Sequence, residues 1–149
     1  MYETVLWATD ASPDADGALQ EALRLLQPGG RLIAFHCDER LLGGRSAGQP
    51  LLVDEHERRV KLGTQVAQLR ADGVDAELIV ETTRHSTAGA IVRAAESHAA
   101  GVIVCGTRGL GVIAGTVAGS VAMRLPHVAS CPVVVVSEKA MERATVAIA

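Results

Sequence analysis

A glycine-rich stretch in the second half of the chain gives the clearest indication of its fold: Gly106-Thr-Arg-Gly109-Leu-Gly111-Val-Ile-Ala-Gly115-Thr-Val-Ala-Gly119-Ser120. The run before it, Gly101-Val-Ile-Val-Cys105, is short and continuously apolar, which is typical of a strand buried on both faces of a parallel sheet. After it, Val117, Val121 and Leu125 recur at four-residue spacing, as on one side of a helix. The glycines therefore lie between a strand and a helix, where unpaired backbone N–H groups and the positive end of the helix dipole attract anions.

The spacing within this stretch is more specific than the number of glycines. It follows the pattern G-x2-G-x9-G-[ST], formed by Gly106, Gly109, Gly119 and Ser120. The first two glycines leave room where the backbone must bend or approach a ligand closely. The nine residues that follow let the chain leave and return, so that Gly119 and Ser120 can present N–H groups and a hydroxyl to the same phosphates. We therefore predict a phosphate-binding segment.

Other residues of the segment leave more than one interpretation open. Arg108 can neutralise phosphate charge or be solvated, and Thr107 and Ser120 can bind phosphate or serve only as caps. The run Gly109-Leu-Gly111-Val-Ile-Ala114 also matches the dinucleotide fingerprint G-x-G-x-x-[GA]. That fingerprint belongs after the first strand of its fold, whereas only one strand is expected to follow it here, so we do not favour a dehydrogenase. The Gly-Lys-[Ser/Thr] sequence of P-loop ATPases does not occur in the chain.

Strand and helix patterns alternate through the whole chain. Short apolar runs predict strands at residues 4–8, 31–36, 76–80, 101–105 and 133–136, with helices between them. Five strands alternating with four helices predict an α/β fold, a doubly wound, Rossmann-like parallel sheet in the order 3-2-1-4-5 with helices on both faces. In such a sheet the ligand lies at the carboxyl ends of the strands, where the first and fourth strands diverge. Those two strands lead into Asp10 and Gly106.

The four helices have recognisable signals. The first is expected to have Ser12 as its N-cap and Pro13 at its first position, and to continue through Leu26 until Pro28 ends it. The second runs from about residue 51 or 54 to residue 71. Its expected apolar contacts are Val60, Leu62, Val66, Ala67 and Leu69. A connecting loop at residues 82–87, with caps at Ser86 or Thr87, precedes the third helix, and the fourth ends at about residue 127.

Length and composition predict a single domain over residues 1–149. A chain of 149 residues can bury a substantial core without disulfides or metals. The longest irregular stretch, residues 38–50, has the length of a lid, an interaction segment or a disordered loop. The tail after about residue 137 is expected to be loosely held.

Charge and composition also limit the expected partners. A net charge of −3, with one Trp, one Tyr and one Phe, argues against a nucleic-acid partner, because such proteins offer basic patches and aromatic stacking surfaces. The longest apolar runs fall well short of the roughly 18 residues that span a bilayer, and the first residues lack a basic region followed by an apolar one. We therefore expect a soluble, cytoplasmic protein without a membrane partner.

The cysteines and histidines do not indicate a metal site. Cys37, Cys105 and Cys131 are too few and too scattered for a disulfide framework or a zinc site, and we interpret them as small apolar residues in a reducing compartment. His36 lies within an apolar run and is interpreted as a strand-end histidine with satisfied hydrogen bonds, not as a ligand or a base. The remaining histidines lack a metal-ligand spacing.

These features together resemble the universal stress protein family, in its nucleotide-binding branch. The resemblance covers essentially the whole chain: the opening Val-Leu-Trp-Ala-Thr-Asp10, the second strand ending at His36-Cys37, the glycine pattern, and the closing strand after Cys131-Pro132. The chain departs from the family in having Gly101 where many members have an Asp. It also has His85-Ser86-Thr87 where many members have a Gly-x-Pro turn.

The resemblance implies a site for ATP. In the ATP-binding members, the residue matching Asp10 contacts the nucleoside, the residue matching Cys37 contacts the adenine, and the glycine segment holds the ribose and phosphates. The nucleotide-binding residues expected here are Ala8, Thr9, Asp10, Cys37, Cys105, Gly106, Thr107, Arg108, Gly109, Gly119, Ser120 and Val121. Mg²⁺ can accompany the phosphates, held by nucleotide oxygens more than by the protein. A plainer interpretation of Asp10 is that it only initiates the turn after its strand.

The resemblance further implies a dimeric, nucleotide-dependent stress-response regulator whose last strands, residues 133–136, pair across a homodimer. We identify no catalytic triad or general base in the sequence, so we expect binding with at most slow ATP hydrolysis and assign no catalytic or metal-binding residue. Two alternatives stay open. The protein can act through protein contacts without binding nucleotide, its glycines serving only helix–strand packing, or it can bind AMP or cyclic AMP in the same place.

Overall fold

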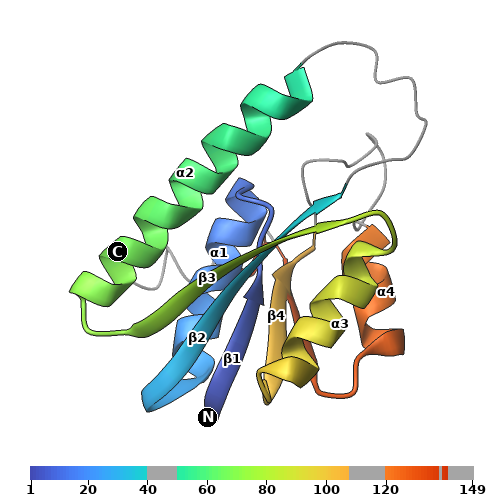
Figure 1. Cartoon of the computed structure of the whole chain (residues 1–149). Helices are drawn as coiled ribbons and strands as arrows, with labels where there is room; N and C mark the ends of the chain where they lie inside the picture. The colour runs from blue at the N-terminus through green and yellow to red at the C-terminus, as the bar shows by residue number, and fades with distance from the viewer. Residues whose placement is uncertain (40–49, 108–119, 138, 141–149) are drawn as a thin grey trace.

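The structure, a computed structural model, describes residues 1–39, 50–107, 120–137 and 139–140 (Figure 1). Strands and helices alternate along the described chain. In order, the elements are β1 (Tyr2–Ala8), α1 (Pro13–Leu25), β2 (Leu26–Glu39), α2 (Pro50–Ala71), β3 (Asp75–Thr83), α3 (Thr87–Ser97), β4 (Val102–Gly106), α4 (Ser120–Val128) and β5 (Val133–Val136).

The strands form one parallel sheet in the order β3-β2-β1-β4-β5, which confirms the predicted fold and strand order. The central strand β1 has β2 on one side, with Trp7 opposite Ala34, and β4 on the other, with Trp7 opposite Val104. The chain leaves β1 and β4 at the same edge of the sheet. This places the segments after β1 and β4 at the predicted switch point.

Two helices cover each face of the sheet (Figure 1). Successive side chains of a strand point to opposite faces, so each strand contributes to two cores. Val5 and Trp7 pack with residues of α1 and α2, whereas Leu6 and Ala8 pack with residues of α3 and α4. Val5, Leu6 and Trp7 are completely buried. The continuous apolar runs of the sequence therefore reflect burial on both faces.

The first helix begins as predicted and ends earlier. Ser12 is its N-cap, with Oγ accepting a hydrogen bond from the Ala15 N–H, and Pro13 is its first residue. The prediction that Leu26 belongs to this helix is wrong, because Leu26 is extended and opens β2. Pro28 disfavours helical backbone in the residue before it, so the helix has to end ahead of that point. The residues between Leu26 and Arg31 are accommodated by a register shift against β1.

The apolar contacts expected for α2 are only partly confirmed. Leu62, Val66 and Leu69 are buried, whereas Val60 and Ala67 are exposed. The three buried residues recur at the four- and three-residue spacings that share one side of a helix, and the two exposed residues lie on the opposite side. The helix is 22 residues long. Neither α2 nor any other helix in the described part of the chain is long and apolar enough to cross a membrane.

Other boundaries shift by a few residues. The predicted strand at 76–80 extends to Thr83, so Thr82 and Thr83 belong to β3 and not to the connecting loop. Residues 38 and 39, expected to begin the long irregular stretch, belong to β2. The strands are longer because β3 pairs with β2 along its whole length, from Asp75 opposite Arg31 to Thr83 opposite Glu39. The remainder of the irregular stretch, residues 40–49, lies outside the described residues.

Two glycines allow the packing at the base of the sheet to be tested. A Cβ at Gly30 would lie 2.7 Å from the Glu3 carbonyl oxygen, whereas a Cβ at Gly63, within α2, would have no atom within 4 Å. We expect Gly30→Ala to lower the free energy of unfolding by about 1–3 kcal/mol, since a backbone atom must move. Gly63→Ala should raise it by about 0.5–1 kcal/mol, because alanine favours the helix. Urea unfolding of both variants measures this, and equal effects would contradict the packing described for Gly30.

Candidate functional site

The edge of the sheet where β1 and β4 end carries two of the segments singled out in the sequence. Thr9 and Asp10 follow β1. Gly106 is the last residue of β4, and Thr107 follows it. Gly106 lies against the first turn of α1, the helix that follows Asp10, because a Cβ at Gly106 would lie 2.8 Å from the carbonyl oxygen of Asp14. Arg108, Gly109 and Gly119 of the predicted phosphate-binding segment lie outside the described residues.

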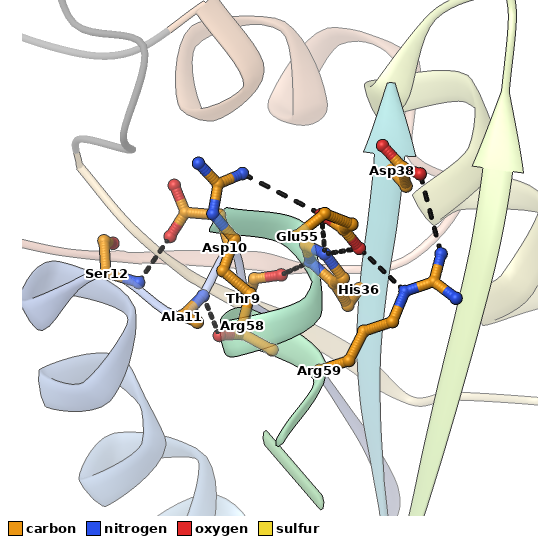
Figure 2. A network of polar contacts seen from close by, with 9 residues as sticks. All are labelled: Thr9, Asp10, Ala11, Ser12, His36, Asp38, Glu55, Arg58 and Arg59. Carbon is orange, nitrogen blue, oxygen red and sulfur yellow. Dashed lines mark hydrogen bonds and ion pairs between the residues drawn. The ribbon is translucent and has the colours of Figure 1, made fainter. Parts of the chain in front are cut away.

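The loop of residues 9–12, between β1 and α1, is held by hydrogen bonds of its own side chains. Thr9 Oγ1 accepts from the Ala11 N–H at 3.0 Å, and Asp10 Oδ1 accepts from the Ser12 N–H at 3.0 Å (Figure 2). Ala11 has a φ of 65°, in the left-handed region that side chains disfavour. Asp10 thus takes part in the turn after β1, with one of its carboxylate oxygens hydrogen-bonded within that turn.

A buried histidine connects this loop to helix α2. His36 is 1% exposed and lies on the face of the sheet that α1 and α2 cover. Its Nδ1 is 3.0 Å from the carbonyl oxygen of Thr9, and its Nε2 is 2.9 and 3.1 Å from the two carboxylate oxygens of Glu55 (Figure 2). The prediction that His36 has satisfied hydrogen bonds is confirmed, whereas its predicted place at the end of the strand is wrong, because β2 continues to Glu39.

Glu55 is at the centre of a wider ion-pair network. Arg59 Nε donates to Glu55 Oε1 at 2.9 Å and its Nη2 is 3.5 Å from Asp38 Oδ2, and Arg58 Nη1 is 3.9 Å from Glu55 Oε2. Burial raises the pKa of Glu55, but the hydrogen bond from Arg59 and the charge of His36 outweigh this effect. The pKa of Glu55 therefore lies below the ordinary glutamate value.

A second residue of α2 holds the other end of the loop. Lys61 Nζ donates to the carbonyl oxygen of Ala11 at 2.7 Å and to Asp16 Oδ2 at 2.6 Å. Gln65 Nε2 donates to the other oxygen of Asp16 at 2.9 Å. Helix α2 thus holds the loop of residues 9–12 at two points. Its Lys61 contacts Ala11 directly, and its Glu55 contacts His36 of β2, which in turn contacts Thr9.

Sequence reasoning did not identify Glu55, Arg58, Arg59 or Lys61. The i,i+4 spacing of Glu55 and Arg59 is visible in the sequence, but it is as common on solvated helices as at functional sites. Nothing in the sequence pairs Glu55 with His36, because the two residues meet only when α2 packs across the sheet.

The residues predicted on β4 and α4 have several structural roles. The Thr107 N–H and its Oγ1 both donate to the Val136 carbonyl oxygen, at 3.0 and 2.9 Å, so this side chain acts as a cap for the end of β5. Cys105 is buried, which raises the pKa of its thiol to about 11. Ser120 is exposed at the start of α4, and Val121 packs with the core beneath α3 and α4.

Cys37, the expected adenine contact, does not end its strand, because β2 continues to Glu39. It is partly buried and packs on the α3 and α4 face, opposite to the face of His36. Ala8 is buried on the same face as Cys37. Within the described residues, no group of three or more His, Cys, Asp or Glu side chains could hold a metal ion.

The lowered pKa of Glu55 predicts a dependence of stability on pH. A carboxyl group of lowered pKa stabilises the fold above its unfolded value of about 4.3, and this contribution is lost as the pH falls through the folded value. We expect Glu55→Gln to be less stable than the wild type at about pH 7, and the difference to shrink below about pH 4. Denaturant unfolding across this range, with the exposed Glu57→Gln as control, measures the effect. A difference that does not change with pH would contradict it.

Comparison with known proteins agrees with the fold. The model of the universal stress protein family matches residues 1–137. A Thermus aquaticus relative, "Universal stress protein in QAH/OAS sulfhydrylase 3'region", is 32% identical over 146 residues, 91% of this chain and 99% of the relative.

Two solved structures are similar along nearly the same length. A universal stress protein family member from Burkholderia pseudomallei has a TM-score of 0.68 at 27% identity, covering 91% of this chain and 96% of its own. A universal stress protein from Archaeoglobus fulgidus, in complex with dAMP, has a TM-score of 0.61 at 25% identity, covering 91% and 97%. The topology, the family match and the sequence identity together show that the chain belongs to the universal stress protein family.

Proposed function

We propose that this protein binds an adenine nucleotide, ATP, at the edge where β1 and β4 diverge, and acts as a nucleotide-dependent regulator. The observation that carries the proposal is that Gly106, the first residue of the glycine pattern, lies at the end of β4 against the first turn of α1, the helix that follows the loop with Asp10. The complex of the Archaeoglobus fulgidus relative with dAMP supports an adenine nucleotide as the class of ligand.

The described part of the site offers groups that fit such a ligand. One carboxylate oxygen of Asp14 is buried and has no hydrogen-bond partner among the residues that the structure describes, and Asp14 lies against Gly106. A donor such as a ribose hydroxyl or a water bound to Mg²⁺ would satisfy it. In the proposed complex Asp10 contacts the nucleoside, Cys37 lies on the adenine side, and Gly109, Gly119 and Ser120 hold the phosphates.

The proposed activity is binding with at most slow hydrolysis. Both ring nitrogens of His36, the buried histidine nearest the loop, already contact Thr9 and Glu55, so His36 is not placed to take a proton from an attacking water. ATP, when bound, would supply the charge and the contacts on which a regulatory state depends.

We further propose a cytoplasmic homodimer that pairs through β5, whose Val135 is 37% exposed at the edge of the sheet.

One observation favours a second candidate function, regulation through protein contacts without a nucleotide. At Gly106 the space of a side chain is filled by the backbone of Asp14, so helix–strand packing by itself accounts for this glycine. If packing also accounts for the other glycines, the spacing of the pattern carries no information about phosphate. A third candidate, binding of a nucleoside monophosphate, shares the site and differs only in the ligand.

The proposal is tested by calorimetric titration of nucleotide-stripped protein with ATP, ADP, AMP and cyclic AMP, with and without Mg²⁺. We expect saturable binding of ATP that is lost in Gly109→Val, because a branched side chain would occupy the space of the phosphates. Gly63→Ala, on the exposed side of α2, serves as the control and should bind as the wild type does. Absence of heat with every nucleotide, from protein shown to be folded, would reject the proposal in favour of protein contacts.

The role of Asp10 is tested by two substitutions that separate its turn from its charge. Asp10→Ala should weaken ATP binding by about 1–3 kcal/mol if the carboxylate holds a buried hydrogen bond to the nucleoside. Asp10→Asn keeps an oxygen that can accept from the Ser12 N–H, and therefore keeps the turn. Weaker binding in both variants would assign the effect to the carboxylate. Wild-type affinity of Asp10→Asn would restrict Asp10 to its turn.

A further inference from the structure

We propose that His36 and Glu55 are positioning residues of the nucleotide site, which hold the loop of residues 9–12 through a shared proton and thereby fix Asp10. The inference rests on the proposed function, and it adds a dependence of nucleotide affinity on pH. Its basis is the contact of His36 with Thr9 on one side and with Glu55 on the other (Figure 2).

The hydrogen bonds of His36 require a proton beyond those of a neutral ring. The carbonyl oxygen of Thr9 can only accept, so Nδ1 must donate to it. The ionised carboxylate of Glu55 can also only accept, so Nε2 must donate as well. A neutral imidazole has a single N–H. The pair therefore holds one additional proton, either on the ring or shared with the carboxylate.

Loss of this proton would turn one of the two contacts from attractive to repulsive. If the neutral ring keeps the hydrogen on Nδ1, the lone pair of Nε2 faces the Glu55 carboxylate. If it keeps the hydrogen on Nε2, the lone pair of Nδ1 faces the Thr9 carbonyl oxygen. Neither tautomer satisfies both partners, so deprotonation must loosen Glu55 or Thr9.

The Thr9 contact controls the loop because the loop is strained. Ala11 keeps its left-handed backbone only as long as its surroundings fix it. Those surroundings are the hydrogen bonds of Thr9 N–H to the Phe35 carbonyl oxygen, of His36 to Thr9, and of Lys61 to Ala11. Asp10 lies between the two residues held by His36 and Lys61, so the direction of its carboxylate depends on them.

Charged groups from several elements surround the pair of His36 and Glu55. From α2 come Glu55 itself and the two arginines, Arg58 and Arg59, that contact it. Asp38, on the same strand and two residues beyond His36, pairs with Arg59, and Asp10 lies in the loop above. On β3 the residue opposite His36 is Val80, and the next residue along β3, Glu81, pairs with Arg93 of α3 on the other face.

Three substitutions separate the two contacts of His36. The amide nitrogen of an Asn side chain takes approximately the place of Nδ1, and that of Gln the place of Nε2. His36→Asn therefore keeps the donor to Thr9 and loses Glu55, whereas His36→Gln keeps the contact to Glu55 and loses Thr9. Glu55→Gln leaves the histidine intact, and its amide can either accept from Nε2 or donate to it, so a neutral ring is tolerated.

The experiment measures ATP affinity by calorimetry at about pH 6 and about pH 9, on either side of the range in which imidazoles titrate. We expect the wild type to bind about tenfold more weakly at the higher pH, since His36 loses its hydrogen bond either to Thr9 of the loop or to Glu55, which holds the ring in place. His36→Gln should bind about tenfold more weakly than His36→Asn at both values of pH. Glu55→Gln should show only the pH dependence that the titration of ATP itself contributes. The pH dependence of Glu55→Gln therefore serves as the baseline for the titration of ATP, and the exposed control Glu57→Gln should behave as the wild type does.

The results distinguish this inference from the proposed function. If the wild type binds no nucleotide at either pH, the proposed function fails and the inference fails with it. If the wild type binds with a pH dependence equal to that of Glu55→Gln, or if His36→Gln binds as tightly as His36→Asn, the inference alone is overturned. Should the His36 variants not fold, the pH dependence of Glu55→Gln still decides. Imidazole ¹⁵N chemical shifts of His36 report the additional proton directly, and a neutral ring at about pH 6 would overturn the inference without any ligand.

Discussion

The structure depends on the complete burial of its central strand. Val5, Leu6 and Trp7 of β1 have no exposed surface, and a strand between two parallel neighbours loses contact with water only when helices cover both of its faces. Helices α1 and α2 meet this requirement on one face, and α3 and α4 meet it on the other (Figure 1). The chain therefore leaves β1 and β4 at one edge of the sheet in diverging directions. The position of the candidate site follows from how β1 is covered, before any side chain of the site is considered.

At that edge the backbone has to find hydrogen-bond partners outside the sheet. The carbonyl oxygens of Thr9 and Ala11 accept from side chains, His36 and Lys61, and not from neighbouring strands. Because Lys61 belongs to α2 and His36 is held by Glu55 of α2, this helix both covers β2 and β3 and completes the hydrogen bonding of the loop after β1. A displacement of the part of α2 that carries Glu55 and Lys61 would therefore change the position of Asp10. This coupling follows from the contacts and needs no conformational change to be assumed.

Much of the fold could be predicted because it depends on local patterns. The apolar runs gave the strands, Ser12 and Pro13 gave the start of α1, and alternation of the elements gave the parallel sheet. The errors arose where a local pattern was ambiguous. Leu26 continues a helical spacing and yet begins β2. Cys37 follows the apolar run of its strand, but β2 goes on pairing with β3 as far as Glu39. In the site, the satisfied hydrogen bonds of His36 were predicted, but its partner was not identified. A glutamate 19 residues away on a polar helix gives the same sequence signal whether it is solvated or paired with a buried histidine.

The glycine pattern shows why a motif and its function have to be argued separately. A glycine is required both where a ligand approaches the backbone and where two elements pack closely, and the sequence is the same in the two cases. At Gly106 the structure identifies the neighbour as the backbone of Asp14, so packing of α1 against β4 is sufficient to explain that position. The packing nevertheless brings the first turn of α1 to the edge where the glycine segment begins, and with it a carboxylate oxygen of Asp14 that has no hydrogen-bond partner in the described part of the chain. The same close approach that explains Gly106 without a ligand thus also builds one wall of the site in which we propose that the ligand binds.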